Sequence, residues 1–202
     1  MCKFRDFGGS KVSEQRPFYQ VLITIQDIEP LIWRRLLIPS GITFHKFHKI
    51  IQAAFDWQDY HLYLFDFNDF LIVNSDPDTP FHDIEKNPKK VKIDPVFKEY
   101  KQFLYEYDFG DSWMHEIVVE EVGIFDEALK HPICIDGERH RPPEDVGGVG
   151  GYEEFINIIN DSNHEEYDEM LSWAEKDTGG RKFDPEYFYK AEINRKLAKI
   201  IF

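Results

Sequence analysis

The stretch YEYDFGDSWMHEIVVEE, residues 105–121, decides the fold class because it has the pattern of two strands joined by a tight turn. Tyr105 and Tyr107 alternate with acidic residues, so the two aromatic side chains share one face of a strand. After the turn, Trp113 begins a second alternating apolar run. Gly110 is the residue expected to adopt the positive φ of the turn. The sequence therefore predicts an antiparallel hairpin near the middle of the chain.

Two more hairpins are predicted on the N-terminal side of this stretch. The runs FYQVLITIQDI and LIWRRLLI, residues 18–28 and 31–38, are rich in β-branched and apolar residues and are separated by a Glu-Pro turn. The run HLYLFDFNDFLIV, residues 61–73, is interrupted by an Asn-Asp pair that is typical of hairpin turns. Between them, Thr43 is expected to cap a helix whose apolar residues recur at three- and four-residue spacing. Residues 74–95 are predicted to form a loop.

Helices are predicted for the C-terminal part of the chain. They follow the loop PPEDVGGVGG, residues 142–151, whose glycines allow a sharp turn. Ser162 and Glu165 have the spacing of a capping box, and Asp184, followed by proline, has the pattern of a later helix start. Strands first and helices last predict an α+β fold. We expect a single domain with a mostly antiparallel sheet, an early helix and a C-terminal group of helices packed on the sheet.

Size and charge narrow the classes of function. The chain has 202 residues, which suits one domain; residues 1–17 are expected to be a flexible lead and residues 18–202 the α+β domain. A net charge of −14 argues against nucleic acid and an anionic membrane as partners. No run approaches the roughly 18 apolar residues of a membrane span. Cys2 and Cys134 cannot form a disulfide framework, so a reducing cytoplasm is the expected location.

The acidic turn and its histidine also suggest a metal site. Asp108, Asp111 and His115 offer carboxylate and imidazole ligands of the kind that hold Mg²⁺, Mn²⁺ or Zn²⁺. Further candidate ligands are His48, His61, Glu144 and Asp145. Each has a structural alternative, namely a hydrogen-bonded core histidine or a carboxylate that accepts turn amides. The Asp-Phe-Gly triplet is not a kinase motif here, because the glycine-rich loop, the strand lysine and the HRD-type loop are missing.

Two arginines in the middle of a predicted strand are unusual. Because neighbouring strand residues point to opposite faces, one of Arg34 and Arg35 is expected to point into the interior or a cleft. A buried arginine is expected to have a carboxylate partner. The candidates for that partner are Asp108, Asp111, Glu144 and Asp145. A structural Arg–Asp network and a clamp for an anionic substrate remain alternatives.

Five segments in this order resemble the plasmid pRiA4b ORF-3-like family: YQVLITIQDIEPLIWRRLLIPSGITFHKFHKIIQAAFDWQDYHLYLF, YEYDFGDSWMHEIVVEEV, ERHRPPEDVGGVGGYEEF, FDPEYF and INRKL. The resemblance covers about residues 18–197. It implies an α+β fold and no established catalytic residue. Family members often have a cysteine directly before the paired prolines, where this chain has Arg141, so a metal site that uses such a cysteine with Cys134 is not expected here.

The resemblance also implies a shared set of polar positions, which we take as the candidate cleft. Its members are Arg34, Arg35, His48, His61, Asp108, Asp111, His115, Glu144 and Asp145. The first interpretation is a binding or accessory module that takes an unknown ligand or protein partner in this cleft. The alternative is a metal-dependent hydrolase that uses the DFGD turn and a histidine. DNA recombination, suggested by a resolvase-type label on some family members, ranks last because the acidic chain lacks a basic DNA-reading helix-turn-helix.

Overall fold

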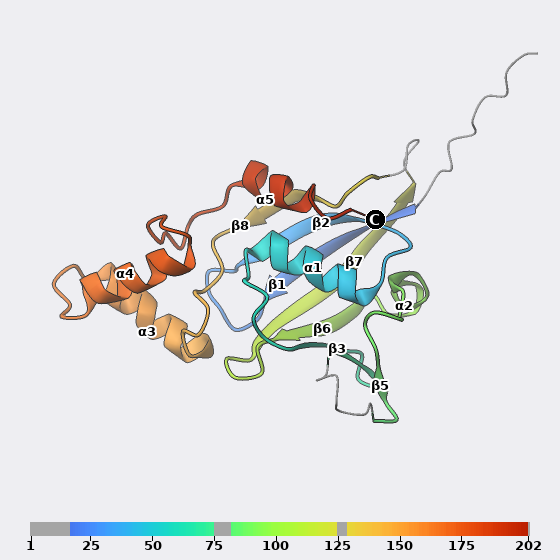
Figure 1. Ribbon diagram of the computed structural model, residues 1–202, viewed down its shortest axis with the longest axis horizontal. Coiled ribbons are helices and arrows are strands. Elements are labelled where there is room, and N and C mark those ends of the chain that lie inside the picture. The colour runs from blue at the N-terminus through green and yellow to red at the C-terminus, as the bar shows by residue number, and fades with distance from the viewer. Residues whose placement is uncertain (1–16, 75–81, 125–128, 202) are drawn as a thin grey trace, which may run out of the picture.

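One sheet organises the molecule. The computed structural model describes residues 17–74, 82–124 and 129–201. Its strands are β1 (Pro17–Ile25), β2 (Trp33–Pro39), β3 (Tyr63–Asp66), β4 (Leu71–Val73), β5 (Glu85–Lys86), β6 (Gln102–Tyr107), β7 (Trp113–Ile124) and β8 (Ile133–Glu138). They lie in the order β5-β4-β3-β6-β7-β1-β2-β8, and only the β4–β5 pair is parallel (Figure 1). The predicted α+β class with a mostly antiparallel sheet is confirmed.

The three predicted hairpins are present as β1–β2, β3–β4 and β6–β7. In the third, Tyr107 pairs with Trp113. Its turn differs from the prediction, because Asp108 and Ser112, rather than Gly110, have positive φ, at 60° and 55°. The carboxylate of Asp108 accepts the N–H of Gly110 at 2.9 Å, a local bond that lets an aspartate adopt the left-handed region.

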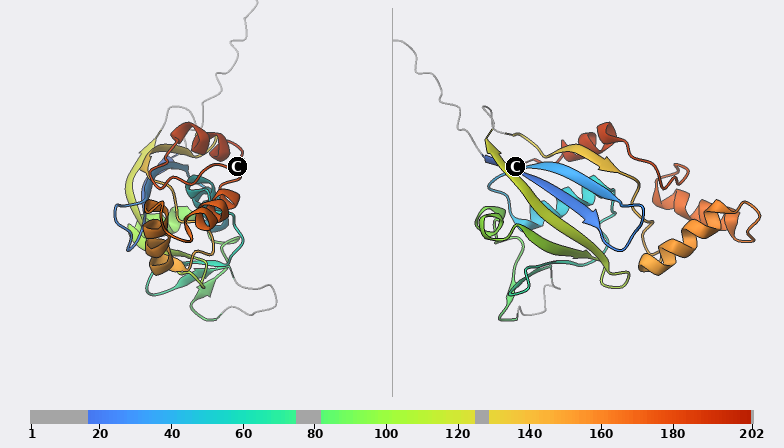
Figure 2. Two further views of the ribbon diagram at one scale, coloured as in Figure 1. Left: turned by 90° about the vertical axis from the view of Figure 1, so that its left-hand side faces the viewer. Right: turned by 180° about the vertical axis from the view of Figure 1, so that it is seen from behind.

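Three helices lie near the sheet: α1 (Phe44–Phe55), α2 (Ile93–Glu99) and α5 (Lys190–Leu197). Helix α1 crosses one face of the sheet, and Figure 2 shows no helix of the described residues in front of the opposite face. Thr43 caps α1 as predicted, with its hydroxyl accepting the N–H of Lys46 at 3.4 Å. The buried side of α1 packs its phenylalanines against the aromatic residues of β3 and β6. Helix α5 packs against α1 and β8.

The remaining two helices, α3 (Gly148–Asn160) and α4 (Tyr167–Asp177), pack against each other and project beyond one end of the sheet (Figure 1). The predicted starts of the last two helices were too early. Helix α4 begins after residue 166, and Ser162 does not cap it. Asp184 forms a turn instead, accepting the N–H of Glu186 at 2.9 Å, and α5 follows later. Local capping patterns also fit turns, which is why the sequence alone misplaced these starts.

The predictions for the loop at residues 74–95 and for the N-terminal lead agree only in part with the structure. The region predicted as a loop, 74–95, contains the short strand β5 and the start of α2. Of the predicted lead, residues 1–16 lie outside the described residues, while Pro17 begins β1. Within the described ranges, no helix has both the length and the apolar character needed to cross a bilayer.

Candidate metal centre

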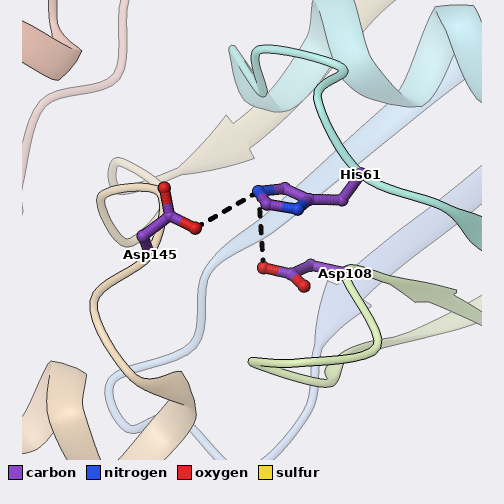
Figure 3. Close-up of side chains that lie close together, drawn as sticks. All are labelled: His61, Asp108 and Asp145. Carbon is purple, nitrogen blue, oxygen red and sulfur yellow. Dashed lines mark ion pairs between the residues drawn. The ribbon is translucent and has the colours of Figure 1, made fainter.

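Four of the predicted cleft residues come together beside the β6–β7 turn. The Nε2 atom of His61 lies 3.5 Å from Asp108 Oδ2, 3.8 Å from Glu144 Oε2 and 3.4 Å from Asp145 Oδ1. Figure 3 shows His61 between the two aspartates. Ligand atoms of His61, Asp108 and Asp145 all lie within 4.8 Å of one another. The histidine precedes β3, Asp108 follows β6, and the other two carboxylates belong to the loop before α3.

The strand register positions His61 and Asp108. Strands β3 and β6 pair Tyr63 with Tyr107, and the N–H of Asp108 donates to the carbonyl of Leu62 at 3.0 Å. Asp108 therefore lies opposite Leu62, and His61 is the next residue, where both chains leave the sheet. The positive φ of Asp108, 60°, turns its chain out of regular strand geometry at this point.

A close approach of two loops positions the other two carboxylates. The carboxylate of Asp111 accepts the N–H of Gly147 at 3.1 Å. A Cβ atom on Gly148, whose φ is +69°, would lie 2.7 Å from the carbonyl oxygen of Asp111. Only glycine permits this contact at that backbone angle. The glycines of the PPEDVGGVGG loop thus bring Glu144 and Asp145 up to the DFGD turn.

Two buried ligand atoms in this cluster have no hydrogen-bond partner within the described residues: His61 Nε2 and Glu144 Oε2. The side chain of Glu144 is only 5% exposed. Its other oxygen, Oε1, accepts the N–H of Gln58 at 2.6 Å and the hydroxyl of Tyr107 at 3.3 Å. Burial raises the pKa of Glu144. A buried carboxylate oxygen without a partner is destabilising, and a cation beside it would remove that cost.

The spacing of the cluster fits a small ion. Ligands about 2.1 Å from an ion in tetrahedral arrangement lie roughly 3.4 Å from one another. The three separations from His61 Nε2, at 3.4, 3.5 and 3.8 Å, are near this value and longer than direct hydrogen bonds. Asp145 leaves one side open, since its side chain is 71% exposed.

Two of the three residues first predicted as ligands lie outside this group. The carboxylate of Asp111 accepts the N–H of Gly147 in the loop before α3. His115 is fully buried, and both its nitrogens have partners: Nδ1 donates to the carbonyl of Trp113 at 2.9 Å, and Nε2 accepts the indole N–H of Trp57 at 3.3 Å. The potential ligands that the structure brings together therefore include Asp108, with His61 and Asp145 in place of the other two.

The two arginines of β2 point to opposite faces, as predicted. Arg34 is buried and donates to the carbonyls of Trp33, Ala54, Glu138 and Arg139 at 2.7–3.0 Å. Its guanidinium lies between the rings of Phe55 and Phe188. The expectation that a carboxylate pairs with the buried arginine is wrong, because backbone carbonyls accept its hydrogen bonds instead. Arg35 is on the other face and forms two hydrogen bonds with Glu120. Neither arginine has a hydrogen bond or ion pair with His61, Asp108, Glu144 or Asp145.

His48 is a core histidine with both nitrogens occupied. Nδ1 lies 2.8 Å from the hydroxyl of Tyr105, and Nε2 lies 2.7 Å from Asp59 Oδ1. Burial lowers the pKa of His48 to about 4, so the ring is neutral at pH 7 and the contact with Asp59 is a hydrogen bond more than an ion pair. The ring also stacks on Tyr63 at 3.6 Å. This is the structural alternative weighed for a histidine on an apolar helix face.

Sequence reasoning missed the supports of the cluster. Gln58 and Tyr107 hold Glu144, and Arg141 pairs with Asp177 at 2.7 Å while its guanidinium lies over Trp57. Gln58 comes shortly after the end of a helix, and Arg141 directly precedes the paired prolines. Neither position has a recognisable motif that predicts this role. Only the alternation that places Tyr107 on the buried face of its strand was a usable signal.

The buried histidines predict that the fold is sensitive to acid. Burial lowers the pKa of His48 and His115 to about 4 and that of His140 to about 3, where the positive charge of Arg141 adds to the effect. In the unfolded chain these residues bind protons below about pH 6.5. Their contribution to stability is therefore complete above that pH and is lost as the pH falls toward 4.

Urea unfolding at stepped pH values between neutrality and the folded-state pKa should show the free energy of unfolding falling across this window. Glu144 acts in the opposite direction, because its raised pKa favours the folded state at low pH. The Glu144→Gln variant should therefore lose stability more steeply on acidification. A flat profile for the unsubstituted protein would contradict the assignment of neutral buried histidines.

Comparison with known proteins shows the family of the chain. The family model described as "Plasmid pRiA4b ORF-3-like protein" matches residues 17–192. A protein of Sinorhizobium fredii named "Uncharacterized protein y4hQ" is 34% identical over 181 residues, which cover 87% of this chain and 88% of the relative. The crystal structure of MM3350, a protein of unknown function from Methanosarcina mazei Go1, matches with a TM-score of 0.76 and 38% identity, over 88% of this chain and 97% of that one. The chain therefore belongs to the plasmid pRiA4b ORF-3-like family.

Proposed function

We propose that this protein binds a divalent metal ion through His61, Asp108, Glu144 and Asp145. The observation that carries the proposal is the pair of buried ligand atoms, His61 Nε2 and Glu144 Oε2, that lie 3.8 Å apart without a hydrogen-bond partner among the described residues. Two aspartate oxygens at 3.4 and 3.5 Å from the same nitrogen complete a set of four. The ligand atoms of His61, Asp108 and Asp145 lie within 4.8 Å of one another, and Glu144 Oε2 approaches this group from the side of His61. An ion in this group would give the two buried atoms a partner.

The donor set favours Zn²⁺ or Mn²⁺. Imidazole suits Zn²⁺ and other transition metals, whereas carboxylate oxygens also suit Mn²⁺ and Mg²⁺. Mg²⁺ prefers octahedral geometry with closer ligand contacts and several retained waters. Three carboxylates and one neutral imidazole together overcompensate a charge of plus two, which increases the attraction for the ion.

The position of the cluster supports a role as a binding or accessory module. Its ligands come from the segment before β3, from the β6–β7 turn and from the loop that leads into α3. An ion would connect the sheet to the base of the α3–α4 pair. The scarcity of cysteine and the acidic surface fit a cytoplasmic protein.

Metal-dependent hydrolysis is the second candidate function. The observation that favours it is the 71% exposure of the Asp145 side chain, which leaves the ion open to solvent on one side. Catalytic metal sites keep such a position for water or substrate. There the ion would lower the pKa of a bound water and so supply a nucleophile near neutral pH. A screen of ester and phosphoester substrates with the Zn²⁺- and Mn²⁺-loaded protein tests this candidate.

The test of the proposal is titration of the chelator-treated protein with Zn²⁺ and with Mn²⁺ by isothermal calorimetry. We expect one ion per chain, with an affinity that rises with pH because the ligands bind the ion in their deprotonated forms, and burial raises the pKa of Glu144. Glu144→Gln should remove most of the affinity. It should not destabilise the metal-free protein at neutral pH, because glutamine keeps an oxygen to accept the hydrogen bonds of Gln58 and Tyr107 and removes the carboxylate oxygen that has no partner.

Two neighbouring aspartates provide a matched comparison. Asp108→Asn should weaken the affinity by roughly tenfold or more, because it removes a ligand charge, whereas Asp111→Asn should change it much less. Both residues belong to the same turn, but only Asp108 is a member of the cluster. Equal losses in the two variants, or no ion bound to the unsubstituted protein, would refute the proposed site.

A further inference from the structure

A groove on a different part of the molecule lies between the β1–β2 turn and α3. It has a volume of about 550 Å³, within the range of about 300–1,000 Å³ found for ligand sites. Residues 27–30 of the turn form one wall. The other wall is one side of α3, where Tyr152, Ile156 and Asn160 recur at four-residue spacing. None of the four proposed metal ligands lines this groove.

Tyr152 lines this groove and carries a buried hydroxyl without a partner. The residue is only 3% exposed, and its hydroxyl has no hydrogen-bond partner within the described residues. Burial raises the pKa of Tyr152 to about 12, so the hydroxyl keeps its proton at neutral pH and can donate. Nearly all buried polar groups are hydrogen-bonded, so a hydroxyl without a partner in a residue that lines a groove points to an acceptor on the occupant.

The rim of the groove is acidic and uncompensated. Asp27, Glu29 and Glu153 line it, all three are exposed, and none forms an ion pair with a cation of the described residues. Among the described residues that line it, the one cation is Arg139, which is already paired with Glu186 at 2.8 Å and donates to the carbonyl of Pro30. The groove therefore presents negative charge to an occupant.

Amide and apolar groups complete the surface. Asn157 and Asn160 lie one turn apart on the exposed side of α3, and neither side chain has a hydrogen-bond partner in the described part of the chain. Asparagine amides both donate and accept, as a peptide backbone requires. Ile28 and Ile156 add apolar surface to the two walls.

We propose that this groove binds an extended peptide segment that carries basic side chains. The acidic rim would pair with its lysines or arginines, the two asparagines would hydrogen-bond its backbone, and the hydroxyl of Tyr152 would donate to one of its carbonyls. A second copy of this chain is disfavoured as occupant, because its net charge of −14 repels the acidic rim.

The probe for the test is a fluorescein-labelled hexapeptide of alternating lysine and leucine, titrated with the full-length protein and followed by fluorescence anisotropy. We expect saturable binding, and none for the matching peptide of alternating glutamate and leucine. Glu153→Gln should weaken binding about threefold to fivefold. Glu154→Gln is the matched control, because Glu154 is the next residue of the same helix, is also exposed and does not line the groove.

Tyr152→Phe separates binding from folding. Because the hydroxyl has no partner in the described structure, its removal should leave the melting temperature unchanged or higher, yet weaken peptide binding about fivefold. The proposal is overturned if the lysine peptide does not bind, if Glu153→Gln and Glu154→Gln weaken it equally, or if Tyr152→Phe leaves the affinity intact. Self-association in sedimentation velocity that Glu153→Gln changes and Glu154→Gln does not would also overturn it, by assigning the groove to a second copy.

Discussion

His61→Ala is expected to lower the affinity for Zn²⁺ by at least about 100-fold. Loss of a hydrogen-bonding neighbour of a metal ligand typically costs about 10- to 100-fold in affinity, and loss of the ligand itself costs more. His61 is also the only nitrogen donor of the proposed set, and its Nε2 atom is the point from which all three carboxylates lie within 3.8 Å. Calorimetric titration of the chelator-treated variant measures the loss directly.

His82→Ala is the control for this substitution. His82 is exposed and lies outside the cluster, so its removal should leave Zn²⁺ affinity unchanged. Because His61 also contacts the ring of Tyr107, near-ultraviolet circular dichroism should confirm that the variant keeps its packing. Undiminished Zn²⁺ binding by a folded His61→Ala variant would exclude the site.

Arg34→Ala is expected to lower the free energy of unfolding by roughly 3–5 kcal/mol. The substitution leaves four backbone carbonyls without their donor and empties the space between Phe55 and Phe188. Two of those carbonyls belong to Glu138 and Arg139, at the end of β8 and just beyond it, so Arg34 fixes the edge strand against α1. Urea denaturation at neutral pH measures the change.

Arg35→Ala is the matched comparison, because it changes the next residue of the same strand. The side chains of Arg35 and Glu120 are 29% and 24% exposed, so the loss of their ion pair should cost less than about 1 kcal/mol. If the two variants were destabilised to the same degree, the opposite placement of the two arginines would be wrong. If Arg34 were a clamp for an anionic substrate instead, its removal would leave stability nearly unchanged.

Local patterns made much of the fold predictable. Tyr105, Tyr107 and Trp113 lie on the buried face of the β6–β7 hairpin because strand side chains alternate whatever the rest of the chain does. The cap at Thr43 depends only on residues within one helical turn. The α4 and α5 starts were misplaced since their capping patterns also fit turns, and packing against other elements decides between the two.

Part of the candidate site could likewise be predicted from the sequence, and part could not. The residue types of the ligands, and the set that contains them, could be proposed from the sequence, as could the glycines that let the PPEDVGGVGG loop turn. The sequence could not say that His61 joins Asp108 while His115 turns away from it. That choice follows from the way the chains leave β3 and β6, where His61 is next to Leu62, the residue opposite Asp108, and from the indole N–H of Trp57, which donates to His115.

By itself, the sequence determined the α+β class, the hairpins and the opposite placement of Arg34 and Arg35, because each depends on strand alternation or on turns within a few residues. Only the tertiary structure decided which polar groups meet and which are already satisfied. Glu144 lies 83 positions from His61 along the chain, and its free oxygen exists only because Gln58 and Tyr107 occupy the other one. Contacts over such separations depend on how the whole sheet and its loops pack, and no local sequence pattern predicts them.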